Sequence, residues 1–334
     1  MSGKLLHHVG PTFGFCLVLF SPNFSIEAAD YCGSPQVSDV RISEQPLLAT
    51  LNRNLYDSPQ ETDENAYRTW YETNAAKNLP KAFELAKNYL KDFPAGKYAE
   101  YLKKWVSNTR AKLFNEAVSA KNLDEILRLG NEELAAEPEN LDYLLQLAYQ
   151  LIGMELNAKP PSYSHASQTA DFSLRSIKLI EAGKKPVSVQ QWNQNETLVY
   201  LYQIVGRVEE HNKNQDTALQ YFEKAAKLDP ANVTASFDSG RLYQVRYLSA
   251  AEKYRTIPET ERSAADPSPQ VKAALKEVDD AADAVLQHWI KFLKLTAVNN
   301  AYGSTREEVE KAVGELYKYR HPDAPDGYQA LIKP

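Results

Sequence analysis

The chain has 334 residues, of which 43% are hydrophobic and 25% charged, and these fractions are typical of a soluble globular protein. A formal net charge of −6 argues against a protein that binds nucleic acid through bulk positive charge. Only 13 residues are glycine, which disfavours a glycine-rich β-sandwich or β-barrel.

Residues 1–28 have the pattern of a secretory signal peptide. Lys4 supplies a positive charge, and the eight residues from Phe13 to Phe20 are apolar. A signal-peptide core spans about 7–15 apolar residues and a membrane helix about 20, so this run is too short for a stable membrane span. Ile26-Glu27-Ala28 resembles a cleavage site. We therefore expect cleavage after Ala28 or Ala29 and export to the periplasm or the extracellular space; the alternative is a frayed tail with an incidental apolar stretch.

Residues 29–62 are interpreted as a linker or loosely packed entry segment. They lack helical periodicity and contain turn-forming groups such as Gly33-Ser34-Pro35. Cleavage of the signal removes Cys16, so Cys32 is left without a disulfide partner in its own chain. Large aromatic residues precede both cysteines, whereas lipid attachment needs a small residue there. We expect Cys32 to be inert.

The pattern changes at about residue 63. Apolar positions recur every three or four residues up to about residue 298, with breaks rich in proline or asparagine about every 12–20 residues. This spacing predicts a series of amphipathic helices. No stretch alternates convincingly between apolar and polar residues, so the fold class is predicted to be all-α.

The clearest repeat unit runs from Val199 to Asn232. Counted from Val199, positions 4, 8, 20, 24, 27 and 32 are Tyr202, Gly206, Ala218, Phe222, Ala225 and Pro230. This set resembles the tetratricopeptide (TPR) repeat, a helix–turn–helix unit of about 34 residues. The small residues let the two helices approach closely, the aromatic residue at position 24 fills the gap between units, and the proline ends the second helix.

The same frame fits four other stretches less regularly. One unit begins near Asp63, one ends at Pro138, one begins at Leu141, and one begins at Val233 and has Gly240 at position 8. A long helix over residues 269–295 takes the place of the second helix in the last of these. The TPR resemblance implies a right-handed superhelical solenoid of helix pairs over residues 63–298.

Residues 299–334 are predicted to form a C-terminal capping helix and tail. Ser304 and Glu307 have the spacing of a capping box. Val309, Val313 and Leu316 then mark one apolar face. A solenoid needs such a terminal element, because its last apolar surface would otherwise face water.

No motif for a catalytic nucleophile, a phosphate-binding loop, a dinucleotide or a metalloprotease zinc site is present. The histidines after the signal have no acidic or cysteine partner at a convincing metal-ligand spacing. Carboxylates that are adjacent in sequence, such as Asp279-Asp280, do not face each other on a helix. We therefore expect no catalytic residues, no cofactor and no metal.

The TPR resemblance also implies a binding surface. In that family, positions 2, 5, 9 and 12 of the first helices line a concave groove, and here they include Tyr67, Tyr71, Tyr149, Tyr200, Arg207, Phe237 and Arg241. Tyrosine and arginine often dominate binding energy, because they combine a large area with a polar tip. The alternative is that these tyrosines pack within the fold and only their hydroxyls reach water.

The sequence thus predicts an exported, non-catalytic scaffold that binds a protein or peptide partner in this groove. The lysine and asparagine set with which some TPR proteins hold a terminal carboxylate is not found, which disfavours chaperone tails as the partner. An obligate subunit of an envelope or secretion assembly is one alternative. A helical-repeat glycan-processing enzyme is another, although the chain leaves no length for a separate catalytic domain. Partner identity and oligomeric state stay open.

Overall fold

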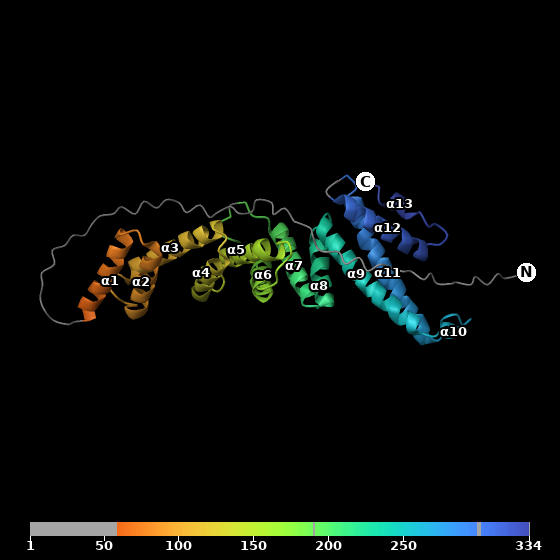
Figure 1. Cartoon of the computed structure of the whole chain (residues 1–334), viewed down its shortest axis with the longest axis horizontal. Coiled ribbons are helices and arrows are strands. Elements are labelled where there is room, and N and C mark those ends of the chain that lie inside the picture. The colour runs from red at the N-terminus through yellow and green to blue at the C-terminus, as the bar shows by residue number, and fades with distance from the viewer. Residues whose placement is uncertain (1–58, 190, 299–301, 334) are drawn as a thin grey trace, which may run out of the picture.

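The computed structural model describes residues 59–189, 191–298 and 302–333. All regular secondary structure in these ranges is helical, as the sequence predicts, and no strand occurs in them. Figure 1 shows α1 to α9 in chain order along the long axis of the molecule, with α9 to α13 grouped at the end opposite α1. The predicted signal peptide, and the predicted linker as far as residue 58, lie outside the described residues.

The first part of the chain is a row of helices, each of which packs against the next one in sequence. Their bounds are α1 (Pro59–Ala75), α2 (Leu79–Asp92), α3 (Ala99–Ser119), α4 (Leu123–Ala136), α5 (Leu141–Leu151), α6 (Ala166–Glu181), α7 (Gln194–His211) and α8 (Gln215–Leu228). A π-helix, η1 (Ile152–Leu156), extends α5. Helix α1 begins inside the predicted linker, because proline suits the first position of a helix.

Three of the turns between paired helices share one conformation. Lys77, Lys121 and Lys213 have φ angles of 58°, 53° and 64°, and each is followed by an asparagine. In each turn the asparagine N–H donates to a carbonyl five residues earlier, for example Asn122 to Ala117 at 2.9 Å. This left-handed residue at the end of a helix satisfies carbonyl groups that the helix leaves free. The α5–α6 connection departs from the pattern and contains the longer segment 152–165.

The last part of the chain is built on a long helix pair. Helices α9 (Val233–Thr256) and α11 (Pro269–Leu295) pack side by side, and the short α10 (Glu259–Arg262) lies at their far end in Figure 1. Helix α11 has the predicted bounds, because Ser268 caps it and Pro269 occupies its first turn.

Helix α12 (Gly303–Arg320) packs against α11, and α13 (Tyr328–Leu331) follows it. Its predicted apolar face is buried, with Val309 at 1% and Val313 at 0% exposure. The predicted capping box is wrong, since the helix begins before Ser304 and has no side-chain cap. Ser304 therefore lies within the helix instead of at its cap. No helix of the described ranges has the length and apolar character that crossing a bilayer requires.

Close contact between neighbouring helices depends on glycines that leave room for a large side chain. A Cβ atom at Gly206 of α7 would lie 2.6 Å from Cε1 of Phe222 on α8, and at Gly240 of α9 it would lie 2.1 Å from Cδ1 of Trp289 on α11. The predicted packing residues Ala218, Phe222 and Ala225 are fully buried, and Tyr202 is 7% exposed.

We predict that Gly240→Ala destabilises the protein by about 1–3 kcal/mol, because Trp289 has to move although alanine favours the helix. Urea unfolding followed by circular dichroism measures this. Gly153→Ala is the matched control, since a Cβ there meets no atom within 4 Å. Equal stability of the two variants would show that Trp289 does not need the space.

Candidate functional site

The predicted groove residue Tyr67 belongs to a packed aromatic group on α1 and α3. Its ring stacks on Tyr98, with the ring centres 3.6 Å apart and the planes at 10°. Burial is the main cause that raises the pKa of its hydroxyl to about 12. Tyr67 therefore contributes most of its surface to the joint between the two helices.

Tyr71 has a different environment. It is 52% exposed, and Tyr101 of α3, which is 44% exposed, lies in the same aromatic group. Both rings contact Trp70, which is 1% exposed and packs edge-on against Trp105 at 5.1 Å. The indole N–H of Trp70 is buried without a hydrogen-bond acceptor in the described structure. Two exposed tyrosines thus stand on a rigid tryptophan base.

Tyr149 of α5 and Tyr200 of α7 contact each other. Their ring centres are 5.2 Å apart with the planes at 61°, and both side chains are partly buried. Helices α5 and α7 are the first helices of two successive helix pairs. The structure therefore brings these two predicted residues together, each from the first helix of its pair.

Arg207 of α7 holds the segment 152–165 in place. Its guanidinium group donates to Oδ1 of Asn157 at 2.8 Å and to the carbonyl oxygen of Leu156 at 2.5 Å. His211 of the same helix stacks on Tyr163 with the ring centres 3.8 Å apart. These contacts hold the irregular segment against α7. The groove prediction expects Arg207 to bind a ligand, but in the structure its guanidinium group binds this segment of the same chain.

Phe237 and Arg241 of α9 are also engaged within the fold. Phe237 is 7% exposed and packs against Phe292 of α11, with the ring centres 5.2 Å apart. Arg241 forms a two-pronged ion pair with Glu210 of α7 and lies 3.5 Å from Asp238. Arg241 therefore links α9 to α7 by an ion pair.

Asp238 is the acidic group of this cluster with a shifted pKa. Burial raises its pKa from 3.8 to about 6, and the negative charge of Glu210 adds to the rise. The positive charges of Arg241 and Arg207 oppose it without cancelling it. The folded protein therefore binds a proton at Asp238 more tightly than an unfolded chain does.

A hollow of about 630 Å³ lies between α3, α5 and the segment 184–188. Its apolar lining includes Phe114 and Tyr143, whose ring centres are 5.1 Å apart. One wall is fixed by Asp142, which accepts backbone hydrogen bonds from Val187 at 2.8 Å and from Ser188 at 2.9 Å. The hollow is therefore a built feature of the fold.

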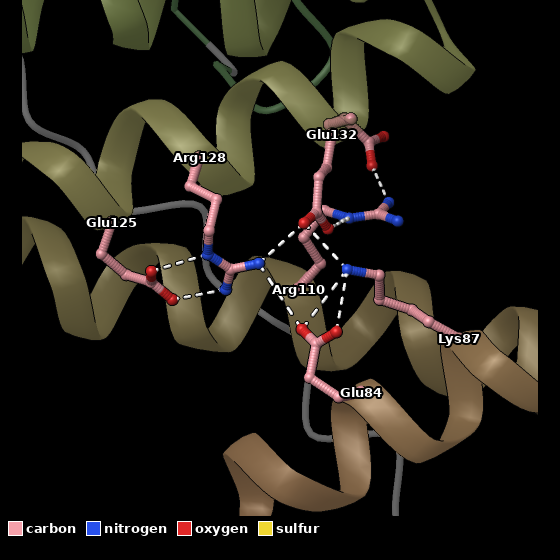
Figure 2. Close-up of polar contacts among 7 residues, drawn as sticks. Glu84, Lys87, Arg110, Glu125, Arg128 and Glu132 are labelled. Carbon is pink, nitrogen blue, oxygen red and sulfur yellow. Dashed lines mark hydrogen bonds and ion pairs between the residues drawn. The ribbon is translucent and has the colours of Figure 1, made fainter.

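An ion network links α3, which lines the hollow, to α4 and α2. Figure 2 shows Arg110 of α3 reaching toward α4, where it pairs with Glu133 and lies 4.0 Å from Glu132. Glu132 also binds Lys87 of α2 at 2.8 Å. The network thus joins three successive helices through side chains that are half-buried or more.

Glu133 links this network to the floor of the hollow. It accepts a hydrogen bond from the amide of Asn140 at 3.3 Å. The Oδ1 atom of Asn140 accepts the backbone N–H of Tyr143 at 3.3 Å and so caps α5. The start of α5, and with it Tyr143, is thereby held in position.

The prediction from sequence missed several of these residues. Tyr101 and Trp105 lie where α3 extends before its repeat unit, so the repeat frame does not include them. Asn115 of α3 also lines the hollow. It stands at position 9 of a repeat unit counted from residue 107, and this count is the sequence signal that could have identified it. Within the described part of the chain, no three His, Cys, Asp or Glu side chains are arranged to hold a metal ion.

No protein-family model matches the chain, and no curated protein matches it.

We predict that Arg110→Ala destabilises the protein by about 3 kcal/mol, because it leaves Glu133 buried without a cation. The double variant Arg110→Met/Glu133→Met recovers most of the loss, since it removes both charges. Lys103→Ala on the same helix is the control, because its pair with Glu100 is exposed to water and therefore contributes little to stability. A loss as small as that of Lys103→Ala would contradict a role for the buried pair. Chemical unfolding measures all three.

We predict that Asp238→Asn becomes more stable than the wild type as the pH rises. Below pH 3.8 both side chains are neutral. Between pH 3.8 and about 6 the wild type loses stability, because the carboxyl of the unfolded chain ionises while the buried carboxyl of the folded protein stays protonated. The stability difference at pH 7 is up to about 2–3 kcal/mol. Urea unfolding of both proteins at pH 4.5 and pH 7 measures it, and a difference that does not change with pH would contradict the prediction.

Proposed function

We propose that the protein is an exported, non-catalytic TPR-type scaffold that binds a segment of a protein partner along its first helices. On this proposal the helix pairs form a right-handed superhelix, and the first helices line its concave face. Three features support the arrangement: helices that pack in sequence order, the repeated Lys-Asn turn, and the glycines that receive large side chains. Export is supported by the pattern of residues 1–28.

The observation that carries the binding function is the pair of exposed tyrosines on successive first helices. Tyr71 and Tyr101 are 52% and 44% exposed, although both contact the buried ring of Trp70. A large aromatic surface on a rigid base loses little conformational entropy when a partner covers it, and its polar tip can form a hydrogen bond. These are the properties of residues that dominate protein interfaces.

The remaining predicted groove residues have different roles in this proposal. Tyr149 and Tyr200 form a second aromatic contact farther along the same series of first helices. Arg207, Phe237 and Arg241 hold the scaffold together, since each is engaged in packing or ion pairing. Arg207 is therefore unsuitable for a binding test, because its removal would also release the segment 152–165.

We predict that Tyr71→Ala/Tyr101→Ala weakens binding of the partner at least about tenfold, which corresponds to about 1.4 kcal/mol. The partner is captured from an envelope extract by the full chain, identified by mass spectrometry and purified. Its dissociation constant is then measured by calorimetry for each variant.

The matched control is Leu174→Ala/Leu275→Ala, which shortens two other exposed apolar residues, on α6 and α11. We expect it to bind the partner as the wild type does. Equal affinity of the tyrosine variant and the wild type would contradict the proposal. An isolated chain that is stable as a monomer would count against the alternative of an obligate assembly subunit.

A further inference from the structure

We propose that the hollow between α3, α5 and the segment 184–188 holds one large apolar side chain of an extended peptide, whose main chain binds the amides of Asn115 and Gln146. This inference rests on the proposed function and specifies the ligand that the scaffold takes. It uses residues other than the exposed tyrosines, so the two proposals can be tested separately.

The walls of the hollow suit an apolar side chain. Ala111 and Phe114 of α3, Leu141 and Tyr143 of α5, and Val187 of the segment 184–188 line it. Val187 is 94% exposed, so its apolar surface gains contact when a ligand enters. The volume of about 630 Å³ is within the range of about 300–1,000 Å³ that is usual for ligand sites. It accommodates a large side chain together with the adjoining main chain.

Two amide side chains among the lining residues have no hydrogen-bond partner within the described structure. Asn115 and Gln146 are both half-buried, and they come from the neighbouring first helices α3 and α5. Each amide group has two N–H donors and one carbonyl acceptor. An extended peptide has one donor and one acceptor per residue on its main chain, so the two sets complement each other. A purely apolar ligand would cover these amides without satisfying them, which costs binding free energy.

The charges at the rim exclude a strongly charged ligand. Lys184 pairs with Glu139, and the carboxylate of Asp142 already accepts hydrogen bonds from the segment 184–188. The two other charged lining residues, Glu137 and Lys185, have opposite signs. No arginine cluster that would hold a phosphate lines the hollow. A neutral apolar residue therefore fits better than a phosphorylated or acidic one.

The hollow is held in shape before any ligand binds. Asp142 fixes the segment 184–188, and the chain of contacts from Glu133 through Asn140 fixes the start of α5. A preformed site binds more tightly than a flexible one, because little conformational entropy is lost on binding.

The test uses a library of random twelve-residue peptides displayed on phage, selected against the immobilised full chain. Enriched peptides are synthesised with a fluorescent label, and fluorescence anisotropy measures their affinity. We expect the enriched peptides to share one large apolar residue, whose replacement by alanine weakens binding at least tenfold.

On the protein side, Asn115→Ala/Gln146→Ala should weaken binding of the same peptides at least tenfold. Ala111→Trp fills the hollow with an indole ring and should have a similar effect; it keeps the test conclusive if the double variant folds poorly. The matched control is Asn131→Ala/Gln150→Ala, which removes the same two amide types from α4 and α5 outside the hollow. It should change the affinity less than twofold.

Several results would overturn the inference. They are the enrichment of no peptide, enriched peptides without a shared apolar residue, and full affinity in both Asn115→Ala/Gln146→Ala and Ala111→Trp. Self-association of the chain that Ala111→Trp abolishes would assign the hollow to a second copy and overturn it as well. If the purified partner still needs Tyr71 and Tyr101 in any of these cases, the scaffold function stands and only the inference about the hollow fails.

Discussion

The structure depends on one constraint: each helix buries its apolar face on the helix that follows it in the chain. In two of these pairs a large ring of one helix occupies the space above a glycine of the other. Gly206 and Gly240 provide this space, and the rings of Phe222 and Trp289 fill it. Because packing is local along the chain, the first helices stand next to one another in sequence order. That order is what brings Tyr71 and Tyr101 to the same residue, Trp70, and places Tyr149 against Tyr200.

Ion pairs and hydrogen bonds between side chains also hold helices together, both consecutive helices and helices two apart in the chain. The network around Arg110 joins α2, α3 and α4, and the pair of Arg241 with Glu210 joins α7 and α9. Both contain carboxylates or guanidinium groups that are largely removed from water. Such groups destabilise the fold when they lose a partner, so they favour one relative arrangement of the helices. The raised pKa of Asp238 is a direct consequence of this burial.

The irregular parts of the chain lie beside its candidate binding surfaces. The segment 152–165 replaces the usual turn between paired helices and is fastened to α7 by Arg207. The segment 184–188 closes one side of the hollow, since Asp142 holds it against α5. Regular repeats thus supply a rigid frame, and two longer connections shape the surface on it. The proposed peptide site combines both, with its amides on helices and one wall on a connection.

The sequence by itself determined the all-helical fold, the bounds of α11, the buried face of α12 and the small and large residues of the best repeat, because helical periodicity and proline or cap signals act over a few residues. It did not determine which groove positions are open. Phe237 and Arg241 occupy predicted groove positions, yet α11 covers the first and Glu210 binds the second. The capping box at Ser304 failed because α12 already begins at Gly303, directly after Tyr302, whose ring packs against Phe292 of α11. The hollow forms only when Asn115, Gln146 and residues 184–188 lie side by side. These residues are far apart in the sequence, so only the tertiary structure brings them together.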